Sequence, residues 1–148
     1  MNRIFFGGLL TLLAAVALGQ SDYAQVVKVN GNFDDIKDSL VLAIERQGLV
    51  INSTSHVGSM LERTGRDIGN DKRIYKNAEV IEFCSAKVSR AVMETDPKAI
   101  VLCPYSISIY TLPGKAETVF LAYRKFPIDA SVKHAADLVE GIVEDAIR

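Results

Sequence analysis

The two cysteines, Cys84 and Cys103, are the residues with the clearest capacity for chemistry in this 148-residue chain. In a protein that leaves the cytoplasm, an even pair of cysteines is a candidate disulfide, whereas separate buried thiols would only pack. The pair could also hold a metal or haem or carry out redox chemistry. The chain has no Cys-x-x-Cys or Cys-x-x-Cys-His motif, so a thioredoxin-type site and covalent haem attachment have no support. The disulfide, the separate thiols and the metal or redox site stay open.

The two histidines, His56 and His134, have no second His, Cys or carboxylate at a recognised ligand spacing. His56 and Met60, four residues apart, would form a soft ligand pair on a helix. A capped helix start at His56 and a core position for Met60 explain the same residues, and we expect these structural roles. His134 precedes Asp137 by three residues, which predicts a solvated ion pair. The weak candidate metal ligands are therefore Cys84, Cys103, His56 and Met60.

The sequence contains no recognisable catalytic motif. None of its serines lies in a Gly-x-Ser-x-Gly motif, and the Gly65 to Gly69 spacing lacks the Lys-Ser/Thr of a phosphate-binding loop. The charge is balanced, with 17 Lys and Arg against 18 Asp and Glu, which gives no electrostatic case for binding nucleic acid. These observations lean toward a protein that is not an enzyme.

The N-terminus has the three parts of a signal peptide. Asn2 and Arg3 form a short polar start, residues 4–18 carry no charge, and Ala17 and Gly19 place small residues before Gln20. An uncleaved membrane anchor is the competing interpretation, but an apolar run of about 15 residues is shorter than the roughly 20 that span a bilayer. We therefore expect a signal peptide over residues 1–19, a mature domain over 20–148 without a stable membrane anchor, and a periplasmic or secreted location.

The remaining chain predicts five strands and three clear helices. Asn32 and Ser85 are typical helix N-caps, Gly48 is a typical C-terminal stop, and Pro97 should end the helix before it at Asp96. The expected strands are residues 26–29, 49–51, 78–84, 105–112 and 119–126. The expected helices are residues 33–47, 86–96 and 131–148, with a further short helix ending near residue 65 and a charged loop over 63–73.

These elements favour an α+β fold: a single two-layer domain in which about three helices cover one face of a mainly antiparallel sheet. Residues 105–126 are expected to form a hairpin with a longish loop. Four of its aromatic residues, Tyr105, Tyr110, Tyr123 and Phe126, are expected to cluster. Because helices on one face leave the other face uncovered, we expect a homodimer that buries this hairpin.

Four short segments give the chain a resemblance to a known family. They are Asn32-Phe33-Asp34-Asp35, the junction from Ala43-Ile44 to Gly48-Leu49, Glu82-Phe83-Cys84, and Leu102-Cys103-Pro104. With them the chain resembles the domain-of-unknown-function 302 family over roughly residues 26–146. The resemblance implies a small α+β fold similar to the TATA-binding-protein superfold, frequent dimers and no agreed activity. Many members carry a Pro-Cys pair where this chain has Pro104-Tyr105, so a role for that cysteine does not transfer.

The sequence thus predicts an exported, non-catalytic ligand-binding or accessory protein whose cofactor is unknown and whose partner is an unidentified small ligand or protein. The alternative is a periplasmic redox or metal- or haem-binding protein that uses Cys84 and Cys103.

Overall fold

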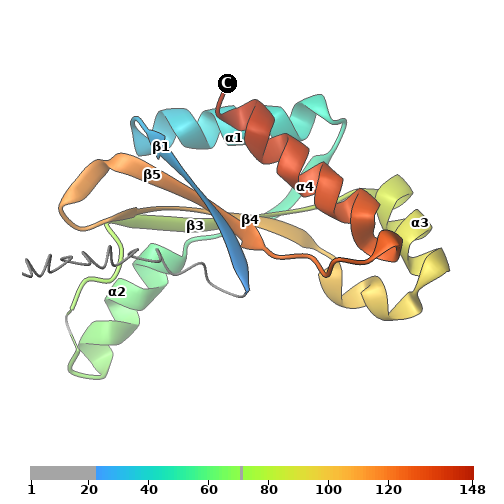
Figure 1. The fold of residues 1–148 in the computed structure, drawn as a ribbon. Helices are drawn as coiled ribbons and strands as arrows, with labels where there is room; N and C mark the ends of the chain where they lie inside the picture. The colour runs from blue at the N-terminus through green and yellow to red at the C-terminus, as the bar shows by residue number, and fades with distance from the viewer. Residues whose placement is uncertain (1–22, 71) are drawn as a thin grey trace, which may run out of the picture.

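The computed structural model describes residues 23–70 and 72–148. The expected signal peptide and its cleavage site lie outside these residues. No helix within the described ranges has the length and apolar character needed to cross a membrane. The fold is α+β, as predicted, and consists of one antiparallel sheet with its helices (Figure 1).

The sheet has five strands in the order β1-β5-β4-β3-β2, and every neighbouring pair is antiparallel. The strands are β1 (Ala24–Asn30), β2 (Val50–Ser55), β3 (Asn77–Cys84), β4 (Tyr105–Leu112) and β5 (Lys115–Arg124). Because β1 pairs with β5, the first and last strands are neighbours. Only β4 and β5 are joined by a hairpin.

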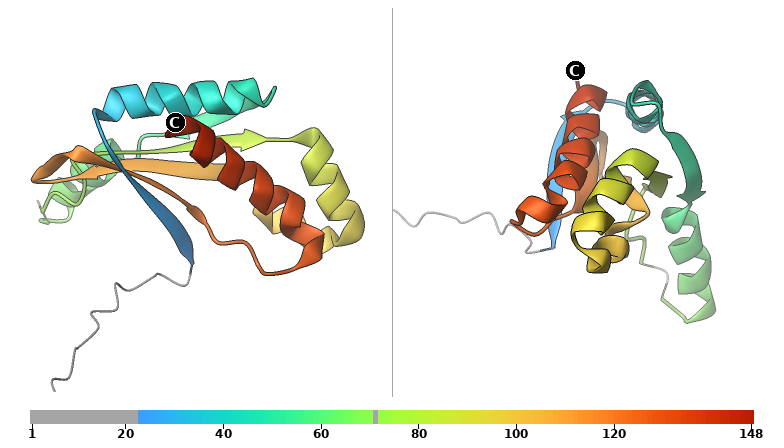
Figure 2. Two further views of the ribbon diagram at one scale, coloured as in Figure 1. Left: turned by 45° about the horizontal axis from the view of Figure 1, so that its top comes forward. Right: turned by 90° about the vertical axis from the view of Figure 1, so that its right-hand side faces the viewer.

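Three α-helices form a layer on one face of the sheet: α1 (Phe33–Arg46), α3 (Ala86–Thr95) and α4 (Lys133–Ala146). Helix α4 contacts both α1 and α3, and Figures 1 and 2 show α1 and α4 side by side over the sheet. Helix α2 (Val57–Asp67) contacts β3 and lies below the sheet in the view of Figure 1. Apart from α2 at its β3 end, the opposite face has no helical layer within the part of the chain that the structure describes.

The helix boundaries follow from capping chemistry. The Asn32 side chain accepts a hydrogen bond of 2.8 Å from the backbone N–H of Asp34, and Gly48 has a φ of 71° just beyond the end of α1. Ser85 accepts from the Val88 N–H at 3.3 Å and so begins α3. Helix α3 ends before Asp96, as Pro97 requires.

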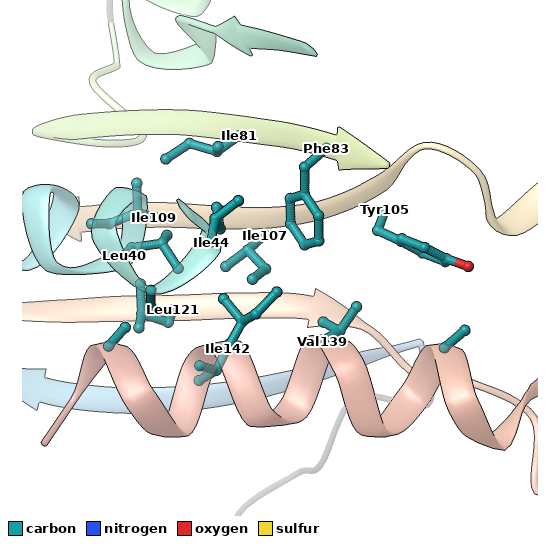
Figure 3. Close-up of a cluster of buried hydrophobic side chains, with 14 of the residues drawn as sticks. Leu40, Ile44, Ile81, Phe83, Tyr105, Ile107, Ile109, Leu121, Val139 and Ile142 are labelled. Atoms are coloured by element: carbon teal, nitrogen blue, oxygen red, sulfur yellow. The ribbon is translucent and has the colours of Figure 1, made fainter. Parts of the chain in front are cut away.

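The core lies between the sheet and the three covering helices (Figure 3). Along β3 and β4, alternate side chains point into it. The largest side chains with at most 1% exposure are Phe83, Leu40, Ile44, Ile81, Ile107, Ile109, Leu121, Ile142, Val119 and Val139.

Two predicted boundaries in the second half of the chain are wrong. The β4–β5 hairpin has a tight turn at Pro113 and Gly114 and no long loop, because β5 begins at Lys115 and not at Val119. Gly114 supplies the required positive φ of 76°. The last helix is also divided, since a 3-10 turn, η2 (Ala130–Val132), precedes α4.

Two further differences come from tertiary pairing. Strand β2 continues through the polar segment to Ser55, because Ser53 and Ser55 pair with Glu82 and Val80 of β3. Helix α2 extends to Asp67, so part of the expected charged loop is helical. The apolar residues 100–102 belong to a 3-10 helix, η1 (Pro97–Leu102).

Candidate functional site

The uncovered face of the sheet carries side chains in ordered rows. Its strands are in register, so one residue from each neighbouring strand falls in each row. The row that we call the aromatic row consists of Ala78, Tyr110, Phe120 and Lys28. The next row along, the small row, consists of Val80, Ser108, Ala122 and Val26.

The small row forms the floor of a groove. Rows on one face of a sheet are about 7 Å apart, so Ser108 and Ala122 leave a hollow beside the bulky Tyr110 and Phe120. On the side of the small row away from Tyr110 and Phe120, β4 carries Ser106 and β5 carries Arg124. The resulting groove has a volume of about 860 Å³ and runs over β3, β4, β5 and β1, with Val57 and Tyr75 at its α2 end. This volume lies in the range of small-molecule sites.

The aromatic wall of the groove is formed by Tyr75 and Tyr110, and Phe120 stacks on Tyr110 without lining the groove itself. Tyr110 stacks on Phe120 with ring centroids 4.9 Å apart and planes 7° apart. Tyr75 meets Tyr110 edge-on at 5.3 Å. Burial raises the pKa of Tyr110, and the nearby Tyr75 and Tyr23 add to the shift. The Tyr110 hydroxyl therefore stays protonated at neutral pH and can donate a hydrogen bond.

Two of the three charged side chains that line the groove, those of Lys28 and Arg124, are basic. Within the described ranges Lys28 forms no ion pair, and the Arg124 guanidinium donates from Nη1 to the Val101 carbonyl at 2.9 Å. Glu79 also lines the groove, but its register partner is the buried Ile109, and its Oε2 lies 3.1 Å from Nζ of Lys37 on α1. The Glu79 carboxylate is thus already neutralised from the helix side.

The groove floor also presents unused hydroxyl groups. Among the described residues, neither Ser106 nor Ser108 has a hydrogen-bond partner for its side chain. The site therefore combines apolar rings, hydroxyl groups and positive charge, which is the composition of a binding site for an amphipathic molecule.

The structure brings the two cysteines together, a contact that the sequence left open. Their Sγ atoms are 3.1 Å apart, and both are free thiols. Burial, followed by the hydrogen bond with Cys103, raises the pKa of Cys84 to about 11. Nucleophilic cysteines need a lowered pKa, so Cys84 lacks the character of a redox catalyst.

The expected helix start at His56 is confirmed, but the side-chain cap and the core position of Met60 are wrong. His56 stands at the start of α2 but its side chain makes no capping bond; Nδ1 instead lies 3.3 Å from Oε1 of Glu79. Met60 is 41% exposed and is not a core residue. Within residues 23–70 and 72–148, no group of three His, Cys, Asp or Glu side chains is placed to hold a metal ion.

The expected ion pair of His134 is also wrong, because Asp137 pairs with Lys133, whose Nζ lies 2.6 Å away. Lys133 precedes Asp137 by four residues, the helical spacing that favours ion pairs.

The expected aromatic cluster divides between the two faces of the sheet. Tyr105 is buried, and Tyr123 and Phe126 pack against the core. Tyr110 faces the groove, and Tyr123 also borders it although it packs against the core. The sequence reasoning missed Tyr75, Phe120 and Lys28. The alternation of Lys28 with Val27 and Val29, which is typical of a half-buried strand, was a signal in the sequence that Lys28 is exposed. The strand register that brings Lys28, Tyr75 and Phe120 onto one face could not be read from the sequence.

Comparison with known proteins supports the fold. The model of a family described as "Domain of unknown function DUF302" matches residues 25–148. The crystal structure of an uncharacterized conserved protein DUF302 from Bacillus stearothermophilus superposes with a TM-score of 0.65 and 16% sequence identity, covering 86% of this chain and 100% of that chain. No curated protein matches the chain. Because the family match extends over nearly all of the described residues, the chain belongs to the domain-of-unknown-function 302 family.

Proposed function

We propose that this protein is a non-catalytic binding protein that holds a small amphipathic anion in the groove on the uncovered face of the sheet. The observation that carries the proposal is the groove itself, in which an aromatic wall, free hydroxyl groups and two basic side chains surround a floor of small residues. The ligand class is a planar aromatic ring bearing a carboxylate or sulfonate group.

Each part of such a ligand has a matching feature in the groove. A ring can lie on the small row and pack against Tyr110 and Tyr75, both of which line the groove, since aromatic pairs favour offset or edge contacts. The acidic group can reach Lys28 or Arg124, and polar atoms can bond to the hydroxyls of Ser106 and Ser108. Because Lys28 and Arg124 are positively charged and the Glu79 carboxylate is already paired with Lys37, the groove should bind anions better than cations.

An enzymatic role has less support from the same residues. A serine nucleophile needs a base within hydrogen-bond reach, and the two histidines are not among the residues that line the groove. The redox or metal-binding alternative is supported by the closeness of Cys84 and Cys103, but the raised pKa of Cys84 opposes a reactive thiolate.

Fluorescence titration with anilinonaphthalene sulfonate, an aromatic anion, tests the charge preference. The change Lys28→Glu is expected to weaken binding about tenfold, because one favourable charge contact becomes repulsive. The neutral N-phenylnaphthylamine should bind both proteins equally. Lys87→Glu, an exposed charge reversal on α3, is the matched control and should change neither probe. Equal sulfonate affinity in wild type and Lys28→Glu would contradict the anion preference.

Filling the floor of the groove with a larger side chain tests whether the probes bind there. Ser108→Leu places a bulky side chain in the small row and should abolish binding of both probes. Ser53→Leu introduces the same side chain on the edge strand β2, and Ser53 does not line the groove, so binding should persist. Circular dichroism and the thermal midpoint confirm that both variants are folded. If Ser108→Leu folds and still binds both probes with wild-type affinity, the proposed site is wrong.

We also propose export with a mature N-terminus at Gln20, and a homodimer through the uncovered face. Mass spectrometry of the mature protein tests the first, and a full-length membrane-held chain would contradict it. Light scattering tests the second, and a monomer at micromolar concentrations would contradict it. Tyr110→Asp is a suitable interface variant, whereas Tyr123→Asp is not, because Tyr123 packs against the core.

A further inference from the structure

The end of β3 and the start of β4 place two sulfur atoms within bonding reach. Phe83 pairs with Tyr105 in the register of these strands, and the cysteines follow and precede this pair, where the two strands separate. Their Sγ atoms are 3.1 Å apart, so bond formation needs only a small movement. The geometry points to a disulfide between Cys84 and Cys103 that forms on oxidation and acts as a structural clamp.

Several features favour this pairing over other fates of the thiols. Each cysteine is half-buried, so an oxidant can reach the pair. The chain contains no third cysteine that could compete. The nearest hydroxyl, Oγ of Ser89, is 3.9 Å from the Cys103 sulfur and 3.3 Å from the Tyr105 oxygen. The Cys103 sulfur therefore lies closer to the Cys84 sulfur than to this hydroxyl.

The oxidation can be written with a disulfide reagent such as oxidised glutathione or a protein disulfide as electron acceptor. The Cys103 thiolate attacks one sulfur of the reagent, which forms a mixed disulfide and releases one reagent thiol. The Cys84 thiolate then attacks the Cys103 sulfur and releases the second. Two protein thiols and one reagent disulfide thus give one protein disulfide and two reagent thiols, which carry the two protons. The same balance holds if Cys84 attacks the reagent first.

The clamp would hold a specific part of the fold. It closes the segment from Cys84 to Cys103, which contains α3 and η1. The Val101 carbonyl of η1 accepts the hydrogen bond from Arg124. The disulfide would therefore also hold in place the side chain of Arg124, one of the two basic residues of the groove. This last consequence rests on the proposed function, whereas the disulfide does not.

Thiol counting after treatment with oxidised glutathione tests the inference. The protein, denatured without reductant, is expected to contain no free thiol and to run as a single chain. Its mass should be lower than that of the reduced protein by two hydrogens. Two free thiols under these conditions, or a disulfide between two chains, would overturn the assignment. An absorbing or metallic group released on denaturation would overturn it in favour of a cofactor site.

Thermal unfolding tests the clamp. Reduction should lower the midpoint of the oxidised protein by roughly 10 °C, because the closed loop restricts the unfolded chain. Cys84→Ser, Cys103→Ser and the double variant should each unfold close to the reduced wild type, since each removes the same bond. The reduced wild type supplies the reference if a variant fails to fold. Equal midpoints for the oxidised and reduced wild type would overturn the clamp, whether or not probe binding to the groove is observed.

Discussion

Replacing Phe83 with alanine is expected to lower the free energy of unfolding by about 3–5 kcal/mol. The side chain is fully buried and lies on β3 between the sheet and the covering helices (Figure 3). Its ring centroid is 6.2 Å from that of Tyr105, so the change also removes an aromatic contact. Urea unfolding followed by circular dichroism measures the loss.

Val80→Ala is the matched control for Phe83→Ala, because Val80 lies three residues earlier on the same strand and faces the groove. It should cost only about 1 kcal/mol, since a half-buried side chain loses fewer contacts. If the two variants were equally destabilised, the uncovered face would be as well packed as the core, and the groove would not be an open site.

The change Gly58→Ala should lower the free energy of unfolding by about 1–3 kcal/mol. A Cβ at Gly58 would lie 2.9 Å from the backbone nitrogen and 3.4 Å from the oxygen of Ala78. Neither backbone atom can move without displacing β3, so α2 must shift away from the sheet. Because Val57 and Tyr75 line the α2 end of the groove, binding of the neutral probe should weaken as well.

Gly141→Ala provides the comparison for Gly58→Ala. Gly141 is in α4, and an added Cβ there would meet no atom within 4 Å. Alanine favours helix by roughly 1 kcal/mol over glycine, so this variant should be neutral or more stable. Chemical denaturation of both variants gives the answer, and a stable Gly58→Ala with unchanged probe binding would contradict the close approach of α2 to β3.

Much of the fold could be predicted from the sequence because local signals determine it. Asn32, Ser85 and Gly48 mark helix ends through their own side chain or backbone, and each is confirmed. The alternation of Ile107 and Ile109 with serines identified the half-buried strand β4. These signals act over a few residues and do not depend on the rest of the chain.

The groove could not be predicted in the same way, because it depends on contacts between distant residues. Lys28 reaches Phe120 only because β1 pairs with β5, and Tyr75 reaches Tyr110 only after the chain passes through α2. Tyr123 and Tyr110 looked alike in the sequence, yet the strand period places them on opposite faces. The sequence allowed a contact between Cys84 and Cys103, since each lies at the end of a strand. Only the structure gives the distance between their sulfur atoms, which decides whether they can bond.

Mapping a bound probe by nuclear magnetic resonance tests the central claim most directly. Adding anilinonaphthalene sulfonate to isotope-labelled protein should shift the amide signals of residues in the small row and the aromatic row, Ser108, Tyr110, Ala122 and Lys28 among them. Signals from the exposed surfaces of α1 and α4, on the far face of the sheet, should stay in place. Shifts confined to those helices, with the groove residues unaffected at saturating probe, would contradict the assignment of the uncovered face as the binding site.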